Sequence, residues 1–366
     1  MIKKRSKART LTIPTQYSRS RRLCFLVVLL GTVLFASPSA RDEEGNPWTD
    51  EQGTSHYDQL APHNTWETPL SLNQEPVRQQ EAKTPQFSSQ PSFTFATGLL
   101  WQVVPPTTAK RRIKPSFLLG TIHSEDPRVL QTATQVQAPL AQSKSFCTEM
   151  LATPSAAAAI AGSMLYTNGR TLSSVIGESL FHQLSPLMSA RGIPEQALQM
   201  FKPWAVLMAL WVPQQKTGRV LDLLLYENAQ QQGKTICGLE TVNEQIEIFK
   251  KTSLADQLVF LRGIAKDPDA LSKQHERLIA CYLGRDLAGL LALSRETSPG
   301  SLQEQQSGER FFRRLIDDRN RKMVERMLPR LQQGATFIAV GALHLPGPHG
   351  ILQLLNDRGY AVSPVQ

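Results

Sequence analysis

Two apolar runs of the chain end in the same way, with a glycine followed by a histidine three positions later. Residues 116–119 precede Gly120-Thr121-Ile122-His123, and residues 336–340 precede Gly341-Ala342-Leu343-His344. A short apolar run that stops at a glycine is typical of a buried strand followed by a turn. Strand ends are where α/β folds place their chemistry. The pair therefore predicts that two imidazoles converge on one site.

The remaining hydrophobic pattern alternates short apolar runs with segments of helical period. Further strands are predicted at residues 99–104, 144–150, 235–239 and 361–364. Helices are predicted at 156–165, 172–191, 194–211, 220–232, 303–333 and 350–358, with more between 242 and 295. The expected fold is a single α/β domain over residues 93–366. Its sheet comes from both chain ends around a large helical insert, and the repeated strand–histidine–helix order suggests an ancient duplication.

The first 92 residues differ from the rest in composition. Residues 1–40 hold eight Lys and Arg and no acids, and include a mostly apolar run at 23–36. That run is shorter than the roughly 20 residues that cross a bilayer, so a signal peptide is expected, with a retained inner-membrane anchor as the alternative. Residues 41–92 are rich in Gln, Pro, Ser and Thr, which predicts a disordered tether. The expected location is periplasmic or secreted, with membrane contact only through this N-terminal segment.

Charge and cysteine content narrow the class of protein. The net charge is +9, but eight of the basic residues lie in 1–40, so the rest carries about +1 and no nucleic-acid partner is expected. G-x-S-x-G, P-loop, G-x-G-x-x-G and H-E-x-x-H motifs are absent from the sequence. Cys147, Cys237 and Cys281 form no C-x-x-C pair, which argues against a zinc–thiolate cluster. The fourth cysteine, Cys24, lies in the expected signal segment. The three that remain cannot pair completely, although one disulfide could form in an exported protein.

Two glutamates also follow predicted strands. Glu149 ends the run at 144–150 and Glu240 follows the run at 235–239. Together with His123 and His344 they resemble a ligand set for Zn²⁺, Mn²⁺ or Co²⁺. Such a metal could generate hydroxide at neutral pH, with a remaining glutamate as general base and an arginine holding the oxyanion. The alternative is that both glutamates only cap the helices that follow them.

Several other short stretches have a distinctive order and spacing. They are Leu118 to His123 with Asp126-Pro127-Arg128, Ser145 to Glu149, Lys202-Pro203-Trp204, Asp222, Gly238 to Thr241 with Gln245, Asp318 to Met323, and Val340 to Gly347 with Gly350. With these pieces, residues 94–366 resemble the TraB/PrgY/GumN family, and within it the bacterial GumN-like branch.

The resemblance implies a set of roles. The animal Tiki proteins of the same superfamily are metal-dependent proteases with two G-x-x-H motifs and an acid. By analogy, His123 and His344 would be metal ligands and Glu149 a ligand or base, whereas Glu240 could be a ligand, a base or a cap. The expected function is a metal-dependent hydrolase acting on a peptide or small-molecule substrate, with a peptidase favoured.

Two further residues take roles from the resemblance, and one position departs from it. Arg319 would steady an oxyanion or orient a carboxylate, and Asn320 would make contacts behind the ligands. His349 stands where relatives commonly have an acid or amide. A surface loop position is expected for it, with an additional metal ligand as the alternative. Because a related fold binds haem and the PrgY-like branch is linked to peptide pheromones, a non-catalytic binder of haem or of a peptide signal is the alternative function.

Overall fold

The computed structural model describes residues 94–106, 113–214, 217–296 and 301–365, together with two short N-terminal strands. Those strands, β1 (Trp48–Thr49) and β2 (Ser55–His56), pair antiparallel. The predicted signal or anchor at 1–40 lies outside the described residues, as does the predicted tether at 41–92 apart from these two strands. None of the helices in the described part of the chain is both long and apolar enough to cross a membrane.

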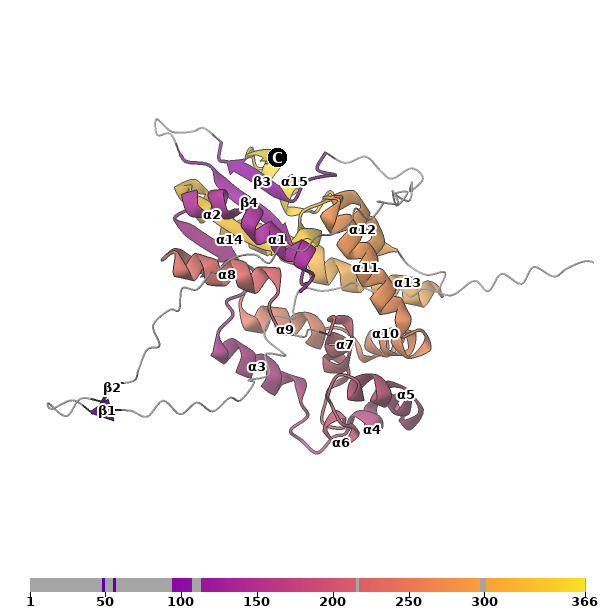
Figure 1. Cartoon of the computed structure of the whole chain (residues 1–366). Coiled ribbons are helices and arrows are strands. Elements are labelled where there is room, and N and C mark those ends of the chain that lie inside the picture. Colours follow the sequence, from indigo (N-terminus) through magenta and orange to yellow (C-terminus); the bar gives the residue numbers. More distant parts are fainter. Residues whose placement is uncertain are drawn as a thin grey trace, which may run out of the picture. The chain divides into compact units, whose positions relative to one another are not determined.

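From residue 94 onwards the chain folds around a six-stranded mixed sheet (Figure 1). Its strands are β3 (Leu100–Val104), β4 (Ser116–Thr121), β5 (Ser145–Thr148), β6 (Thr235–Gly238), β7 (Thr336–Gly341) and β8 (Ala361–Pro364). They are ordered β6-β5-β7-β4-β3-β8. The first four are parallel to one another, and β3 pairs antiparallel with both β4 and β8. The predicted α/β class, with strands from both ends of the domain in one sheet, is confirmed.

Helices cover both faces of the sheet. Those next to it are α1 (Pro127–Gln135), α2 (Gln137–Gln142), α8 (Leu221–Gln231), α14 (Asp318–Gln333) and α15 (Ile351–Asn356). The chain moves from β4 to β5 to β6 in one direction across the sheet and returns from β6 to β7 in the other. Because such crossovers are right-handed, α1, α2 and α8 lie on one face and α14 on the opposite one. On α14, Met323, Met327 and Leu331 recur every four residues and are fully buried.

The insert forms a second hydrophobic core of its own. The helices that contribute buried side chains to it are α3 (Pro154–Met164), α4 (Leu172–Ile176), α5 (Glu178–Ser189), α6 (Glu195–Leu198), α7 (Pro203–Trp211), α9 (Val242–Lys250), α10 (Leu254–Lys266) and α13 (Leu302–Phe312). The buried apolar side chains of α11 (Asp269–Leu283) and α12 (Leu287–Arg295) belong instead to the core around the sheet. Every residue of α7 is buried. The guanidinium of Arg191 donates to the carbonyls of Ala209, Leu210 and Val212, so the end of this apolar helix is capped from outside.

Three predicted helices differ from the observed ones. The helix predicted at 172–191 is two helices, because Gly177 takes a positive φ of 87° between them. The helix predicted at 194–211 is also two, since Pro203 disfavours the helical conformation at the residue before it. The helix predicted at 303–333 is continuous, but it contains a π-helical turn, η2 (Arg313–Asp317), between α13 and α14.

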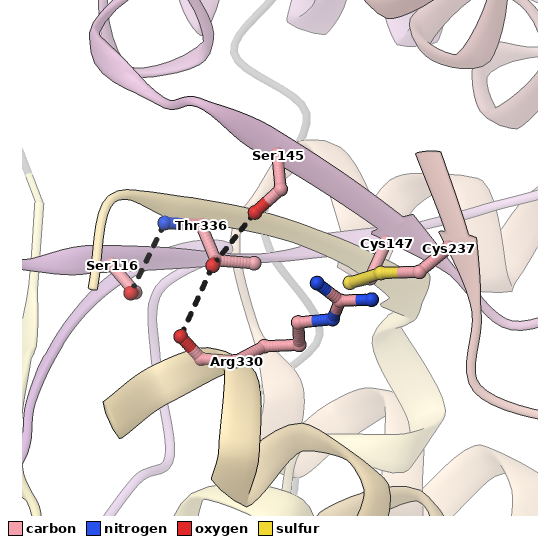
Figure 2. Close-up of a disulfide and its surroundings, with 6 residues drawn as sticks. All are labelled: Ser116, Ser145, Cys147, Cys237, Arg330 and Thr336. Carbon is pink, nitrogen blue, oxygen red and sulfur yellow. Dashed lines mark hydrogen bonds between the residues drawn. A yellow bond between two sulfur atoms is a disulfide. The ribbon is translucent and has the colours of Figure 1, made fainter. Parts of the chain in front are cut away.

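Buried hydroxyl groups link three neighbouring strands at their amino ends (Figure 2). Thr336 on β7 donates its backbone N–H to Ser116 Oγ on β4 at 3.2 Å. Its side-chain hydroxyl lies 2.9 Å from Ser145 Oγ on β5. Buried polar groups require partners, so the three residues favour one pairing register. This register aligns the opposite, carboxyl ends of the same strands.

A disulfide joins β5 to the edge strand β6 (Figure 2). It connects Cys147 and Cys237, which face each other in the strand register and have Cα atoms 4.5 Å apart. Cys281 is free. The sequence allowed one disulfide among the three cysteines without indicating which pair forms it. The bond lies two residues before Glu149 and three before Glu240.

Candidate functional site

Four neighbouring parallel strands end at one edge of the sheet, and each is followed by a predicted site residue. His123 follows β4, Glu149 follows β5 and Glu240 follows β6. His344 ends a short 3₁₀ turn, η3 (Ala342–His344), directly after β7. All four side chains belong to buried residues. This edge of the sheet is where ligand and catalytic groups gather in open α/β folds.

Gly120 allows the two histidine turns to approach each other. A Cβ at this position would lie 2.8 Å from Leu345 Cδ1 and 2.9 Å from Ala342 Cα, closer than Cβ contacts occur. Its carbonyl accepts a hydrogen bond from the buried Tyr282 hydroxyl at 3.0 Å. The first G-x-x-H motif therefore needs its glycine because the turn of the second motif packs against it.

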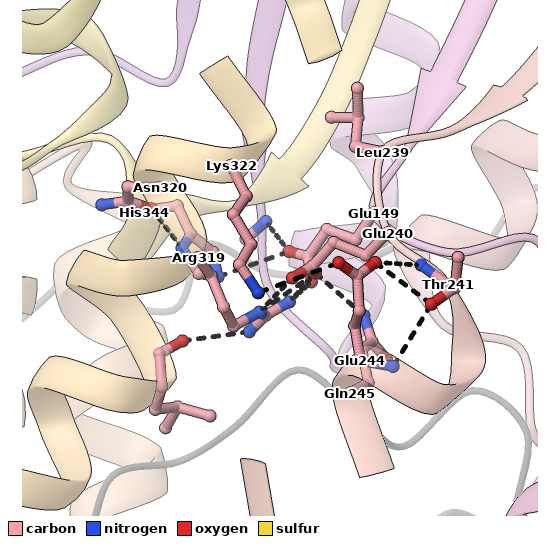
Figure 3. Close-up of polar contacts among 12 residues, drawn as sticks. Glu149, Leu239, Glu240, Thr241, Glu244, Gln245, Arg319, Asn320, Lys322 and His344 are labelled. Atoms are coloured by element: carbon pink, nitrogen blue, oxygen red, sulfur yellow. Dashed lines mark hydrogen bonds and ion pairs between the residues drawn. The ribbon is translucent and has the colours of Figure 1, made fainter. Parts of the chain in front are cut away.

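Arg319 joins the two glutamates (Figure 3). Its Nε lies 2.9 and 3.0 Å from the two carboxylate oxygens of Glu240. Its Nη2 donates to Glu240 Oε2 at 2.6 Å and to Glu149 Oε2 at 2.5 Å. Gln245 adds a bond to Glu240 at 3.2 Å. Two buried carboxylates thus share one buried guanidinium, an arrangement that leaves one negative charge in excess when both are ionised.

The environment of Glu149 favours its neutral form more than is usual for a carboxyl group. Burial raises the pKa of Glu149 to about 6, Arg319 opposes this rise, and the negative charge of Glu240 adds to it. The other carboxylate oxygen, Oε1, accepts a 2.7 Å hydrogen bond from the backbone N–H of Gly341. Glu149 is therefore held between the guanidinium and the main chain of the second histidine motif, with a pKa close to neutrality.

The hydrogen bonds of His344 determine which of its nitrogens carries the proton. Asn320 donates through Nδ2 to the carbonyl of His349 at 2.8 Å, so its Oδ1 faces His344 Nδ1, 2.6 Å away. An amide oxygen only accepts, hence Nδ1 carries the proton and Nε2 has the lone pair. Burial and the charge of Arg319 hold the pKa of His344 well below its ordinary value, so the ring is neutral.

His123 is oriented by a carboxylate instead of an amide. Its Nδ1 lies 3.1 Å from Asp222 Oδ2, and Thr121 donates to the other oxygen of Asp222 at 2.5 Å. Burial raises the pKa of Asp222, but the hydrogen bonds from His123 and Thr121 outweigh this effect and keep it below its usual value. The ionised carboxylate accepts from Nδ1, which directs the Nε2 atom of His123 away from Asp222.

Both Nε2 atoms are buried and have no hydrogen-bond partner. Two neighbouring strands thus present two imidazoles whose Nδ1 atoms are held from behind and whose Nε2 atoms are unpaired. Metal-binding histidines have this pattern, because the second nitrogen is usually held by a carboxylate or a carbonyl. Within the described residues, however, no group of three or more His, Cys, Asp and Glu side chains is arranged to hold a metal.

The structure brings some of the predicted residues into contact and separates others. Glu149, Glu240 and Arg319 form one hydrogen-bonded cluster, and Glu149 Oε1 lies 3.7 Å from His344 Nε2. Within the described residues, no hydrogen bond or ion pair connects His123 to that cluster. The alternative that the glutamates cap helices is wrong, because the caps of α3 and α9 are Thr153 and Thr241. His349 is exposed, as predicted.

Sequence reasoning assigned no role to Asp222, Thr121 or Gln245. Asp222 and Gln245 stand out only as members of the stretches that match the family, and each lies in the first turns of a helix. Thr121 is the residue after the glycine in the first G-x-x-H motif. Its contact with Asp222 joins residues 101 positions apart, which no local pattern could indicate.

The fold and the site define an α/β protein with paired histidines and glutamates at the carboxyl edge of its parallel strands. The chain belongs to the TraB/PrgY/gumN family, which it matches over residues 99–364. It is 26% identical over 316 residues to a zebrafish (Danio rerio) protein named Metalloprotease TIKI2, covering 72% of this chain and 60% of that protein. It thus spans about three fifths of that relative's length. No solved structure matches the chain.

Proposed function

We propose that the protein is a metal-dependent hydrolase, and specifically a peptidase. The observation that carries this proposal is the pair of buried, unpaired Nε2 atoms on His123 and His344, each with Nδ1 held by a neighbouring side chain. Membership of the family and the likeness to a protein named a metalloprotease support it. We further propose that the protein is exported to the periplasm or secreted, where the Cys147–Cys237 disulfide would be stable.

His123 and His344 would hold the metal through Nε2, and Glu149 could complete the set. Imidazole and carboxylate ligands suit Zn²⁺, Mn²⁺ and Co²⁺. When bound, the metal would supply Lewis acidity and lower the pKa of a coordinated water. Glu149, with its pKa near 6, is placed to accept and release a proton near neutral pH if it is not itself a ligand. Arg319, whose N–H groups already serve both glutamates, would orient these carboxylates.

His123→Ala and His344→Ala should each remove bound metal. Each change takes away one of the two buried Nε2 atoms without a hydrogen-bond partner in the described residues, so we expect metal content to fall to below about a tenth of the unsubstituted protein. Elemental analysis of the full chain, purified without added metal, measures this. His182→Ala is the matched control, because His182 is exposed on α5 and should leave the content unchanged. If both site variants kept their metal, the proposal would fail.

Hydrolysis is tested separately with a library of internally quenched peptides. Cleavage should stop on chelation, return when Mn²⁺, Co²⁺ or Zn²⁺ is added, and be absent in both histidine variants. Bound metal without cleavage of any peptide would instead favour a non-catalytic protein. Haem binding, which would give a Soret band lost in the same variants, would favour the haem-binding alternative.

Asp222→Asn should weaken metal binding without removing the ligands. The amide can present an N–H group toward His123 Nδ1, which disfavours the tautomer with a free Nε2 lone pair. We expect a loss of about 10–100-fold in metal affinity, measured by competition with a chelator of known affinity. Asp318→Asn is the control, since Asp318 is exposed and, within the described residues, its ion pair is with Arg321. Equal affinities for the two variants would show that Asp222 does not orient the ligand.

A further inference from the structure

A groove of about 650 Å³ lies between α9 and the helix formed by η2 and α14. Its volume is within the range of small-ligand and peptide sites, roughly 300–1,000 Å³. Glu240 and Arg319 belong to its lining, so the groove reaches the cluster that holds Glu149. Side chains from α9 and from Lys251 just after it form one wall. Arg314 and side chains of the first turns of α14 form the other.

Polar contacts between the two walls lie toward opposite ends of α9. Near its start, Arg326 donates to both carboxylate oxygens of Glu244 at 2.8 Å, and Lys322 lies 3.8 Å from the same carboxylate. Just beyond its end, Arg314 Nη1 donates to Thr252 Oγ1 at 3.0 Å. Polar contacts thus bridge the two walls toward both ends of α9.

The cations of the groove differ in how they are paired. Lys251, Arg319, Arg321 and Lys322 each lie within 4 Å of a carboxylate. Arg314, in the described part of the chain, forms no ion pair, and its hydrogen bond goes to a neutral hydroxyl. It is half-buried and keeps further N–H donors on its guanidinium. A partly desolvated arginine without a carboxylate is suited to bind one supplied by a ligand.

We propose that this groove is the substrate-binding site for a peptide that carries a carboxylate, with Arg314 as the residue that recognises it. The carboxylate is either an acidic side chain or the free C-terminus, since a guanidinium binds both in the same way. This inference rests on the proposed peptidase function and names the chemical class of its substrate. The π-helical turn supports it, because such turns often occur at functional sites and this one contains Arg314 and precedes Arg319.

The test is direct binding of fluorescein-labelled tetrapeptides to the full-length Glu149→Gln variant, which is expected not to cleave them. Four matched peptides have Glu or Gln at one position and a free or amidated C-terminus. We expect at least one carboxylate form to bind about tenfold more tightly than the doubly neutral peptide, in line with a charge-assisted hydrogen bond. The peptide that shows the preference identifies which carboxylate is recognised.

Arg314→Gln in the same background should abolish that preference while leaving the weak binding of the neutral peptide unchanged. Arg313→Gln is the matched control, because Arg313 is exposed in the same π-helical turn and does not line the groove. Thr252→Val should keep the preference, since it removes the hydroxyl and leaves the cation.

Three results would overturn the inference: no preference for any carboxylate, equal losses in the two arginine variants, or loss of neutral-peptide binding in Arg314→Gln. Because the assay measures binding without turnover, its outcome is independent of whether the metal-dependent cleavage test succeeds.

Discussion

Arg319→Ala is expected to lower the free energy of unfolding by about 3–5 kcal/mol. Arg319 is 3% exposed, and among the described residues its guanidinium is the one cationic group within 4 Å of both Glu149 and Glu240. The ring of His344, 3.7 Å from Glu149, is neutral. Removal of Arg319 would leave two buried carboxylates facing each other without a counter-charge. Urea unfolding of the variant and of the unsubstituted protein, followed by circular dichroism, measures the difference.

Two further variants test whether the loss of stability comes from the unpaired glutamates and not simply from the removal of an arginine. Arg321→Ala, whose exposed side chain pairs with exposed Asp318, should change stability by less than about 0.5 kcal/mol. Adding Glu149→Gln and Glu240→Gln to Arg319→Ala should restore part of the loss, because the unpaired charges are removed. If the Arg319 and Arg321 variants unfolded at the same urea concentration, the contacts of Arg319 with Glu149 and Glu240 would not contribute to stability.

Replacing both Cys147 and Cys237 by serine should cost about 2–4 kcal/mol of stability, since the bond closes a loop across 90 positions. Among the described strands, β6 is an edge strand that pairs with β5 alone, and Glu240 lies two residues after its end. Loss of the bond should therefore also loosen the contact between Glu240 and Arg319. Denaturant unfolding with and without a reducing agent measures the change, and the reduced protein should behave like the double variant.

Cys281→Ser provides the comparison, because this free cysteine forms no disulfide and its loss should leave the response to reducing agent intact. If a reducing agent left the free energy of unfolding of the unsubstituted protein unchanged, the assignment of the disulfide would be contradicted. Mass analysis of peptides under non-reducing conditions would independently show whether the two cysteines are joined.

The sequence was sufficient to predict the sheet and the edge where its side chains gather. Each predicted strand is present. A short apolar run bounded by glycine or polar residues is too short for a typical helix and is suited to a strand in a buried sheet. His123, Glu149, Glu240 and His344 were predicted from this strand-end pattern alone. The parallel order of β4, β7, β5 and β6 then makes them neighbours, although the order itself was not predicted.

The contacts behind these residues could not be predicted, because they join segments far apart in the chain. Thr121 and Asp222 meet only after the β5–β6 crossover places α8 over the sheet. Arg319 reaches both glutamates from the opposite face, through a helix whose π-helical turn has no clear sequence signal. Gly177 and Pro203 are local signals for a helix break. The helical period of the apolar residues on either side nevertheless predicted one continuous helix at each place.

The hydroxyl groups of Ser116, Thr336 and Ser145 have a consequence for the far end of the sheet. Side chains alternate between the two faces of a strand, so a slip of one residue would move every following side chain to the wrong face. Glu149 would then point away from Gly341, and His344 would lose its place beside Asn320. The geometry of the candidate site at the carboxyl edge thus depends on three small polar residues at the opposite ends of the same strands. Substitutions there would disturb the site although these residues do not contact it.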